Sequence, residues 1–285
     1  MNRFYFEPSS ICQLACKLCP SQDFNSSRRG FMDYDKYKQL IEQSLSEGCM
    51  SEGDDVHLYG FGEPTLHHLL PEMIQLLFEN NVTTKINTNG MAMGKKVWER
   101  LTDSGLTKCL VSLDGVGQDV YQQYRVGGNY QIVLNNLEYA CQNSAKTEIE
   151  VQMIIFKHNA HQIDDFIKLV KNFGAHVATI KKARKWDGSK DNLKLDNIPV
   201  EYQRELSSPK CRFFDDFGVV LQDGSLTICT SDPFGKYTVG NIFDIGPSLW
   251  TSEQFKRLKS RRKALSICKF CGYDNLYIKK IKLRE

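Results

Sequence analysis

Residues 54–64 read Asp-Asp-Val-His-Leu-Tyr-Gly-Phe-Gly-Glu-Pro, a short apolar stretch that runs directly into a turn with two glycines. The first part predicts a β-strand over Asp54–Tyr59, and the second predicts a turn over Gly60–Pro64. Asn89 and Asp114 likewise follow predicted strands directly. Three neighbouring strands that each end in polar or glycine-rich residues indicate one functional edge of a sheet.

Strands and helices alternate on both sides of this stretch. The predicted strands are Arg3–Glu7, Asp54–Tyr59, Thr83–Asn87, Cys109–Leu113, Glu148–Phe156 and Val177–Lys181, and the predicted helices between them are Met32–Glu47, Leu69–Asn80, Lys95–Ser104, Tyr130–Asn143 and Ile163–Phe173. This order predicts an α/β fold with a parallel sheet and crossover helices. Six strand–helix units are too few for a closed eight-stranded barrel, so we expect an open partial barrel with its functional loops at the carboxyl ends of the strands.

The pattern changes after about residue 185. Residues 186–210 are polar and irregular, which predicts a linker between a domain at 1–185 and a second one at 211–285. Phe217–Leu221 and Leu226–Cys229 flank Asp223-Gly224, a strong hairpin signal. A helix is predicted over Leu249–Leu265.

Composition and charge narrow the class of protein. The chain has 285 residues and a formal net charge of +3, which favours neither nucleic acid nor a membrane surface as partner. The short basic runs 181–185, 261–263 and 279–284 are expected to be solvated. No secretory signal or membrane-spanning stretch is visible, so we expect a cytoplasmic protein with reduced thiols. Ten cysteines then indicate metal binding.

Three of these cysteines lie in one short loop. Cys12, Cys16 and Cys19 have the spacing Cys-x3-Cys-x2-Cys. Three thiolates can hold a [4Fe–4S] cluster and leave one iron open to a small molecule. A structural zinc site normally has a fourth protein ligand close by. None lies near this loop in the sequence, where the closest histidine is His57. The spacing therefore favours an iron–sulfur cluster over zinc.

The cysteine loop, the Gly60–Pro64 turn, the stretch from Ser112 to Gly115 and Arg125 together resemble the motifs of the radical S-adenosylmethionine (SAM) superfamily. The resemblance extends over about residues 1–185. It implies a partial (β/α)6 barrel and reductive cleavage of SAM to a 5′-deoxyadenosyl radical. It also implies a flavodoxin- or ferredoxin-type electron donor.

Several residues become SAM contacts by this resemblance: Gly60, Gly62, Glu63, Ser112 and Arg125. Glycines allow close approach of the backbone to a ligand, and a guanidinium can hold a carboxylate with two parallel donors. Two other interpretations stay open. Gly60–Pro64 would also serve as a plain strand-ending turn, and Arg125 as a surface ion-pair residue.

Four more cysteines fall in the second domain, namely Cys211, Cys229, Cys268 and Cys271. Chemistry alone allows zinc or iron–sulfur for such a set. Residues 211–272 are similar to the auxiliary-cluster extension of radical SAM enzymes, in the shortened "twitch" form of the SPASM domain that 2-deoxy-scyllo-inosamine dehydrogenase carries. This resemblance implies a second [4Fe–4S] cluster. Cys49, Cys109 and Cys141 are expected to have no catalytic role.

The substrate is predicted less directly. The cysteine loop begins at residue 12, which leaves no room for an N-terminal peptide-binding domain and favours a small-molecule substrate. Six polar side chains are expected at the barrel mouth and suit a sugar or cyclitol: Glu7, Tyr59, Asn87, Gln152, His158 and Arg184. His158 and Arg184 are the predicted catalytic residues.

The leading hypothesis is an oxidoreductase that oxidises a carbinol to a ketone and passes an electron to the auxiliary cluster. The alternatives are a radical epimerase, a peptide-modifying maturase and a non-enzymatic metal-binding module.

Overall fold

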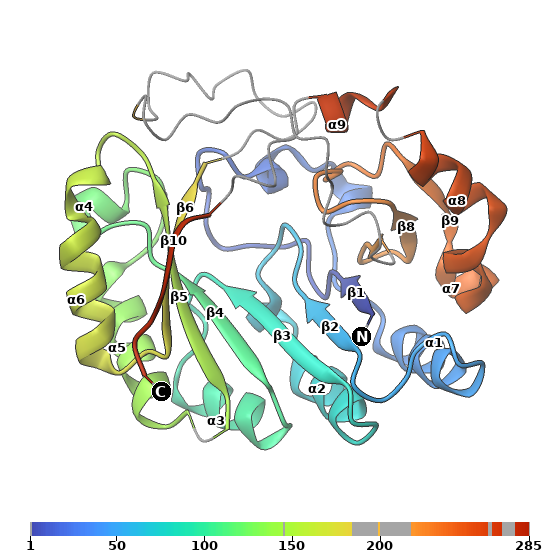
Figure 1. Cartoon of the computed structure of the whole chain (residues 1–285), viewed down its shortest axis with the longest axis horizontal. Helices are drawn as coiled ribbons and strands as arrows, with labels where there is room; N and C mark the ends of the chain where they lie inside the picture. The colour runs from blue at the N-terminus through green and yellow to red at the C-terminus, as the bar shows by residue number, and fades with distance from the viewer. Residues whose placement is uncertain are drawn as a thin grey trace.

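A computed structural model describes residues 2–144, 146–183, 199, 218–261, 264–269 and 277–284. Its centre is a curved sheet with the strand order β10-β6-β5-β4-β3-β2-β1-β7-β8-β9 (Figure 1). The strands are β1 (Arg3–Phe6), β2 (Asp55–Leu58), β3 (Thr83–Thr88), β4 (Lys108–Ser112), β5 (Glu148–Ile155), β6 (Val177–Lys182), β7 (Val219–Val220), β8 (Ser225–Thr227), β9 (Thr238–Asn241) and β10 (Tyr277–Lys282). Strands β1 to β6 pair in parallel and in sequence order, which confirms the predicted partial barrel.

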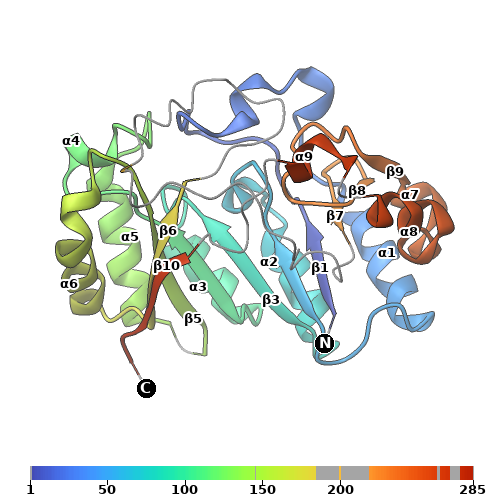
Figure 2. The same ribbon diagram turned by 45° about the horizontal axis from the view of Figure 1, so that its top comes forward.

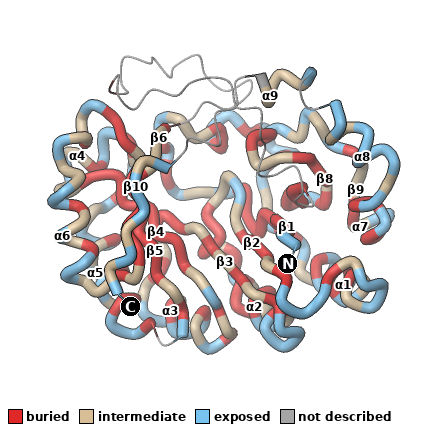
Figure 3. The backbone as a smooth tube through the Cα atoms, in the orientation of Figure 1, coloured by how far each residue is buried: buried red, intermediate tan, exposed pale blue. Residues whose placement is uncertain are grey.

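Helices cover the outer face of the parallel strands (Figure 2). They are α1 (Tyr34–Ser46), α2 (Leu70–Phe78), α3 (Lys95–Asp103), α4 (Gln118–Tyr121), α5 (Tyr130–Gln142) and α6 (Ile163–Phe173), followed in the C-terminal part by α7 (Ile242–Ile245), α8 (Glu253–Ser260) and α9 (Ser266–Lys269). Strand β5 shows why the layers form. Ile149, Val151 and Met153 are fully buried in the apolar core, whereas Glu150 and Gln152 point to the other face, into the barrel. Figure 3 shows the same buried band across the central strands.

The C-terminal part extends the sheet beyond β1. The predicted hairpin is present as β7 and β8, with Gly224 in the left-handed region at φ +88°. Strand β7 pairs with β1 in parallel, so the hairpin continues the barrel sheet. The predicted helix over Leu249–Leu265 is wrong in its bounds. Ser252 has an extended backbone and its side chain accepts a hydrogen bond from the amide of Phe255, so a new helix, α8, begins after Ser252.

Two strands, β9 and β10, were not predicted. Strand β9 completes the hairpin sheet, and β10 pairs antiparallel with β6 on the far edge of the barrel. The predicted linker lies outside the described residues, apart from Pro199, and the domain boundaries stay predictions. Lys181 does not lie on an outer, solvated face as predicted, because its side chain lines the cavity at the carboxyl ends of the strands. Within the described part of the chain, no helix is both long and apolar enough to cross a membrane.

Candidate functional site

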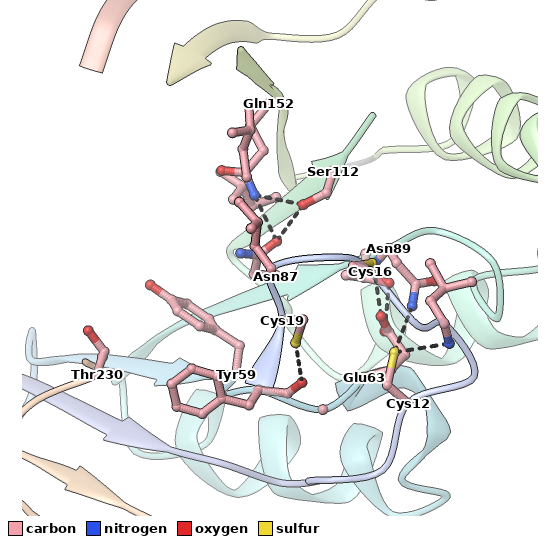
Figure 4. Close-up of a pocket in the computed structure, with 18 of the residues that line it drawn as sticks. Cys12, Cys16, Cys19, Tyr59, Glu63, Asn87, Asn89, Ser112, Gln152 and Thr230 are labelled. Carbon is pink, nitrogen blue, oxygen red and sulfur yellow. Dashed lines mark hydrogen bonds between the residues drawn. The ribbon is translucent and has the colours of Figure 1, made fainter. Parts of the chain in front are cut away.

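A cavity of about 270 Å³ opens at the carboxyl ends of the parallel strands, beside the cysteine loop (Figure 4). Cys12, Cys16 and Cys19 all line it, and so does the Gly60–Glu63 part of the turn after β2. The predicted functional edge of the sheet is therefore one wall of one cavity. This size is near the lower end for small-molecule pockets.

The cysteine loop is held so that its sulfur atoms meet hydrogen-bond donors. Cys12 Sγ accepts from the Leu14 amide at 3.4 Å and from Asn89 Nδ2 at 3.5 Å. Cys16 Sγ accepts from Arg125 Nη1 at 3.7 Å. Burial raises the pKa of the Cys12 thiol to about 12 and also raises that of Cys16, so a metal must displace these protons to bind.

This arrangement suits the thiolate ligands of an iron–sulfur cluster. In a [4Fe–4S] cluster each thiolate binds a different iron atom, so the sulfur atoms stand further apart than the ligands of one ion. Donors aimed at sulfur are also typical of such clusters.

Glu63 connects the glycine turn to the loop after β3. Its carboxylate accepts hydrogen bonds from the Thr65 amide and hydroxyl, from the Thr88 hydroxyl and from the Asn89 amide at 2.8 Å. Burial raises its pKa, although these bonds oppose the shift. All of these hydrogen-bond donors are protein groups, so the bonds hold the Glu63 carboxylate within the fold. The structure thus gives Glu63 a positioning role for Asn89, and its predicted contact with SAM stays a prediction.

The glycines of the turn are needed for close packing within the protein. A Cβ at Gly62 would lie 2.2 Å from the carbonyl oxygen of Ser9, and a Cβ at Gly60 would lie 2.4 Å from the Glu7 side chain. Neither glycine has a positive φ. Space, not backbone conformation, therefore excludes a side chain at both positions.

Arg125 forms an ion pair, but not at the surface. Its Nε donates to Asp114 Oδ2 at 2.5 Å, and the two side chains are 12% and 0% exposed. Arg125 also lines the cavity, next to Cys16. The pair places a guanidinium beside the cysteine loop with its charge balanced by a buried carboxylate.

A polar network spans four strands on the cavity wall. Ser112 Oγ lies 3.2 Å from Asn87 Oδ1, and Gln152 Nε2 donates to Ser112 Oγ at 2.7 Å and to Asn87 Oδ1 at 3.2 Å. Lys181 Nζ donates to Gln152 Oε1. These side chains come from β3 to β6 and present both donors and acceptors to the cavity (Figure 4).

The predicted catalytic pair does not come together in the described structure. His158 is not among the residues that line the cavity, and its ring stacks on Phe156 with centroids 5.4 Å apart. Arg184 lies outside the described residues, as do Cys211 and Cys271. Cys229 and Cys268 are described; both are partly buried and pack against the main core. Sequence reasoning gave no role to Asn89 or Asp114, although each was noted directly after a strand.

Comparisons with known proteins agree with this geometry. The model of the radical SAM superfamily matches residues 6–170, more than half of the chain, so the protein belongs to this superfamily. Mycofactocin maturase MftC of Mycolicibacterium smegmatis is 24% identical over 94% of this chain and 74% of its own length. A probable GTP 3′,8-cyclase of Methanococcus maripaludis is 26% identical over 67% of this chain, and the match spans 61% of the cyclase.

Two solved structures share the fold. BtrN in complex with AdoMet (SAM) and 2-DOIA superposes with a TM-score of 0.61 at 20% identity, covering 97% of this chain and 98% of BtrN. SuiB of Streptococcus suis bound to SAM gives a TM-score of 0.70 at 16% identity, covering 95% and 72%.

Membership of the superfamily makes the protein a SAM-dependent iron–sulfur enzyme. When bound, the [4Fe–4S] cluster and SAM together supply a 5′-deoxyadenosyl radical that removes a hydrogen atom from a substrate. Cys12, Cys16 and Cys19 would hold the cluster. Asn89 and Arg125 direct N–H groups at two of the three sulfur atoms.

Proposed function

We propose that the protein oxidises one carbinol carbon of a small polyhydroxylated molecule, such as a sugar or cyclitol, to a ketone. The observation that carries this proposal is the polar network of Asn87, Ser112, Gln152 and Lys181 in the cavity beside the cysteine loop. Side-chain amides and hydroxyls can each accept and donate, which suits several hydroxyl groups on one ring. BtrN, which shares the fold, was solved with 2-DOIA.

Oxidation of a carbinol requires two electrons, and abstraction of a hydrogen atom removes only one of them. The proposal therefore includes an auxiliary [4Fe–4S] cluster held by Cys211, Cys229, Cys268 and Cys271, to which the second electron passes. Four thiolates would leave no open iron, which suits electron transfer. The proposed reductant of the radical cluster is a flavodoxin- or ferredoxin-type protein.

Product mass in deuterated water tests the reaction type. Anaerobically reconstituted protein is incubated with dithionite, SAM and a panel that contains 2-deoxy-scyllo-inosamine, myo-inositol and common hexoses. Oxidation gives a product two hydrogens lighter than the substrate, with one 5′-deoxyadenosine formed per ketone. A product of unchanged composition with one solvent deuteron would mean epimerisation and would contradict the proposal.

Peptide modification is the second candidate function. SuiB, solved with its precursor peptide SuiA, superposes on 95% of this chain with a TM-score of 0.68. This function would be favoured if no polyol in the panel stimulated 5′-deoxyadenosine formation while a peptide did.

A further inference from the structure

Strand β2 and the residue that follows it carry three hydrogen-bonded polar side chains that lead into the cavity. Asp55, His57 and Tyr59 are alternate residues, so they face the same side of the sheet, the barrel interior. His57 Nε2 lies 2.6 Å from Asp55 Oδ2, and His57 Nδ1 lies 2.9 Å from Tyr59 Oη. Tyr59 lines the cavity, and in the view of Figure 4 it lies across Cys19 from Cys12 and Cys16.

The directions of these hydrogen bonds follow from the charges. The hydrogen bond from His57 lowers the pKa of Asp55 although burial opposes it, so Asp55 is a carboxylate and can only accept. Burial lowers the pKa of His57, against the influence of Asp55, so the imidazole is neutral at neutral pH. Its one N–H is then at Nε2, and Nδ1 accepts from the Tyr59 hydroxyl. With its proton directed at His57, the Tyr59 oxygen can accept but not donate a further hydrogen bond.

The surroundings keep this arrangement in place. Thr83 Oγ1 donates to the second oxygen of Asp55 at 3.1 Å. The ring of Tyr5 packs edge-on against His57 at 4.5 Å between centroids and against Tyr59 at 6.2 Å. His57 is only 7% exposed. Among the residues that the structure describes, the charged and titratable groups around the imidazole are Asp55, Tyr59, Tyr5, Lys85 in register on β3, and Arg3.

We propose that Tyr59 is the proton acceptor for the substrate hydroxyl, with His57 and Asp55 as positioning residues behind it. This inference rests on the proposed oxidation. After a hydrogen atom has left the carbinol carbon, the hydroxyl proton passes to Tyr59 Oη while the phenol proton passes to His57 Nδ1. The C–O bond becomes a carbonyl once one further electron has left, and the proposed auxiliary cluster would accept that electron. The resulting imidazolium is stabilised by Asp55 and loses its proton to solvent after product release.

Replacement of the phenol tests this role. Tyr59→Phe should slow ketone formation by about 100-fold or more. The matched control is Tyr121→Phe, which removes a buried hydroxyl that meets no hydrogen-bond partner among the described residues and does not line the cavity. Equal ketone formation by Tyr59→Phe and the wild type would overturn the proposal.

The pH profile separates proton transfer from a structural role of His57. In the wild type the rate of ketone formation should stay constant from pH 8 down to about 6.5, the ordinary pKa of histidine, and should fall only below it. His57→Gln retains an acceptor near Tyr59 but cannot take a proton in this range. It should therefore be slower and lose this acid limb. An unchanged acid limb in His57→Gln would contradict the role of His57.

A measurement without substrate distinguishes failure of this inference from failure of the proposed function. Nitrogen-15 NMR of histidine-labelled holoenzyme with SAM should show His57 neutral and protonated at Nε2 at pH 7. Tyr59→Phe should shift the Nδ1 resonance, and Asp55→Asn should change the tautomer. A wild-type His57 protonated at Nδ1 would overturn the inference whatever the substrate. If this spectrum is as expected but the wild type oxidises no polyol, the proposed function fails, and Tyr59 as acceptor for a carbinol fails with it.

Discussion

At the scale of residues, a buried ion pair fixes the positions of the side chains beside the cysteine loop. Asp114 is fully buried and holds Arg125, and Arg125 in turn meets Cys16. Asp114 also accepts from the Ile154 amide at 2.6 Å, which connects β4 to β5 at the cavity. The sequence motif predicted a role in SAM binding for Arg125. It could not show that Arg125 would be buried, because Asp114 precedes it by eleven residues and only the fold brings them together.

Arg125→Ala should therefore have two effects. SAM affinity should fall by about tenfold or more if the predicted charge-assisted contact between Arg125 and SAM is lost. The protein should also lose about 3–5 kcal/mol of stability, because Asp114 stays buried without its partner. SAM affinity is measured by equilibrium dialysis, and stability by the denaturant midpoint. The double variant Arg125→Ala, Asp114→Asn should regain much of the stability but not the SAM affinity. If Arg125→Ala bound SAM with the affinity of the wild type, Arg125 would not belong to the SAM site.

At the scale of elements, the parallel strands and their helices could be predicted because each carries its own periodic pattern. Strand β10 could not, because Tyr277–Lys282 reads Tyr-Ile-Lys-Lys-Ile-Lys, in which apolar and basic residues do not alternate, and it becomes a strand by pairing with β6. The hydrogen bonds that connect Asp55, His57 and Tyr59 were not predicted either. Tyr59 and His57 were both noticed in the sequence, but the sequence does not show that their side chains turn toward each other on one face of the sheet.

Glu150 forms ion pairs that connect strand β10 to the rest of the sheet. Its carboxylate is 2% exposed and contacts Lys108 Nζ at 2.8 Å and Lys280 Nζ at 3.1 Å, so it joins β4, β5 and β10. Burial raises its pKa, but the hydrogen bond and charge of Lys108 outweigh this and lower it to about 2.

Because the pKa of Glu150 is lower in the folded state, its contribution is complete above the ordinary value of about 4.3 and is lost as the pH falls toward 2. Glu150→Gln should therefore reduce stability at pH 7 by about 1.5–3 kcal/mol. The difference from the wild type should shrink between pH 5 and pH 3. Thermal unfolding across this range measures it, with Glu79→Gln on the surface as control. A difference that stays constant with pH would mean that the charge of Glu150 is not involved.

The glycine turn after β2 is the element that brings the cysteine loop close to the strand ends. Gly62→Ala would force its Cβ to within 2.2 Å of the Ser9 carbonyl, a backbone atom that cannot move without the loop. We expect Gly62→Ala to lose most SAM binding and part of its iron. Gly30→Ala is a suitable control, because its Cβ would meet no atom closer than 3.9 Å. Iron content and SAM affinity are measured on both variants. Wild-type values for Gly62→Ala would show that the loop can move away at little cost.

At the scale of the whole molecule, one sheet connects the cysteine loop with the C-terminal part. Arg28, from the loop that follows the cysteines, is buried between the two. It pairs with Glu7 at 2.6 Å, donates to Gln222 in the β7–β8 turn, and donates through Nε to the Pro233 carbonyl at 3.0 Å. This contact fixes the hairpin that precedes Cys229 against the end of β1. If the C-terminal cysteines hold the proposed auxiliary cluster, this rigid connection would keep the electron-transfer distance constant.

This arrangement leads to a prediction about the two cysteine sets. Cys268→Ala should lose about four of about eight iron atoms and still cleave SAM, because the radical cluster is held in a different part of the sheet. It should form little ketone, since the second electron then has no acceptor. Cys16→Ala should lose a similar amount of iron but should no longer form 5′-deoxyadenosine. Cys49→Ala is the control, because Cys49 belongs to neither set.

Iron content, 5′-deoxyadenosine and ketone are measured on the same anaerobic preparations, so the three variants can be compared directly. The pattern expected of Cys268→Ala separates SAM cleavage from substrate oxidation, which a general loss of folding cannot do. Full ketone formation by Cys268→Ala would mean that the electron leaves by another route. Loss of zinc instead of iron would identify the C-terminal site as structural and would leave a redox-neutral reaction, such as epimerisation, as the better account of the cavity.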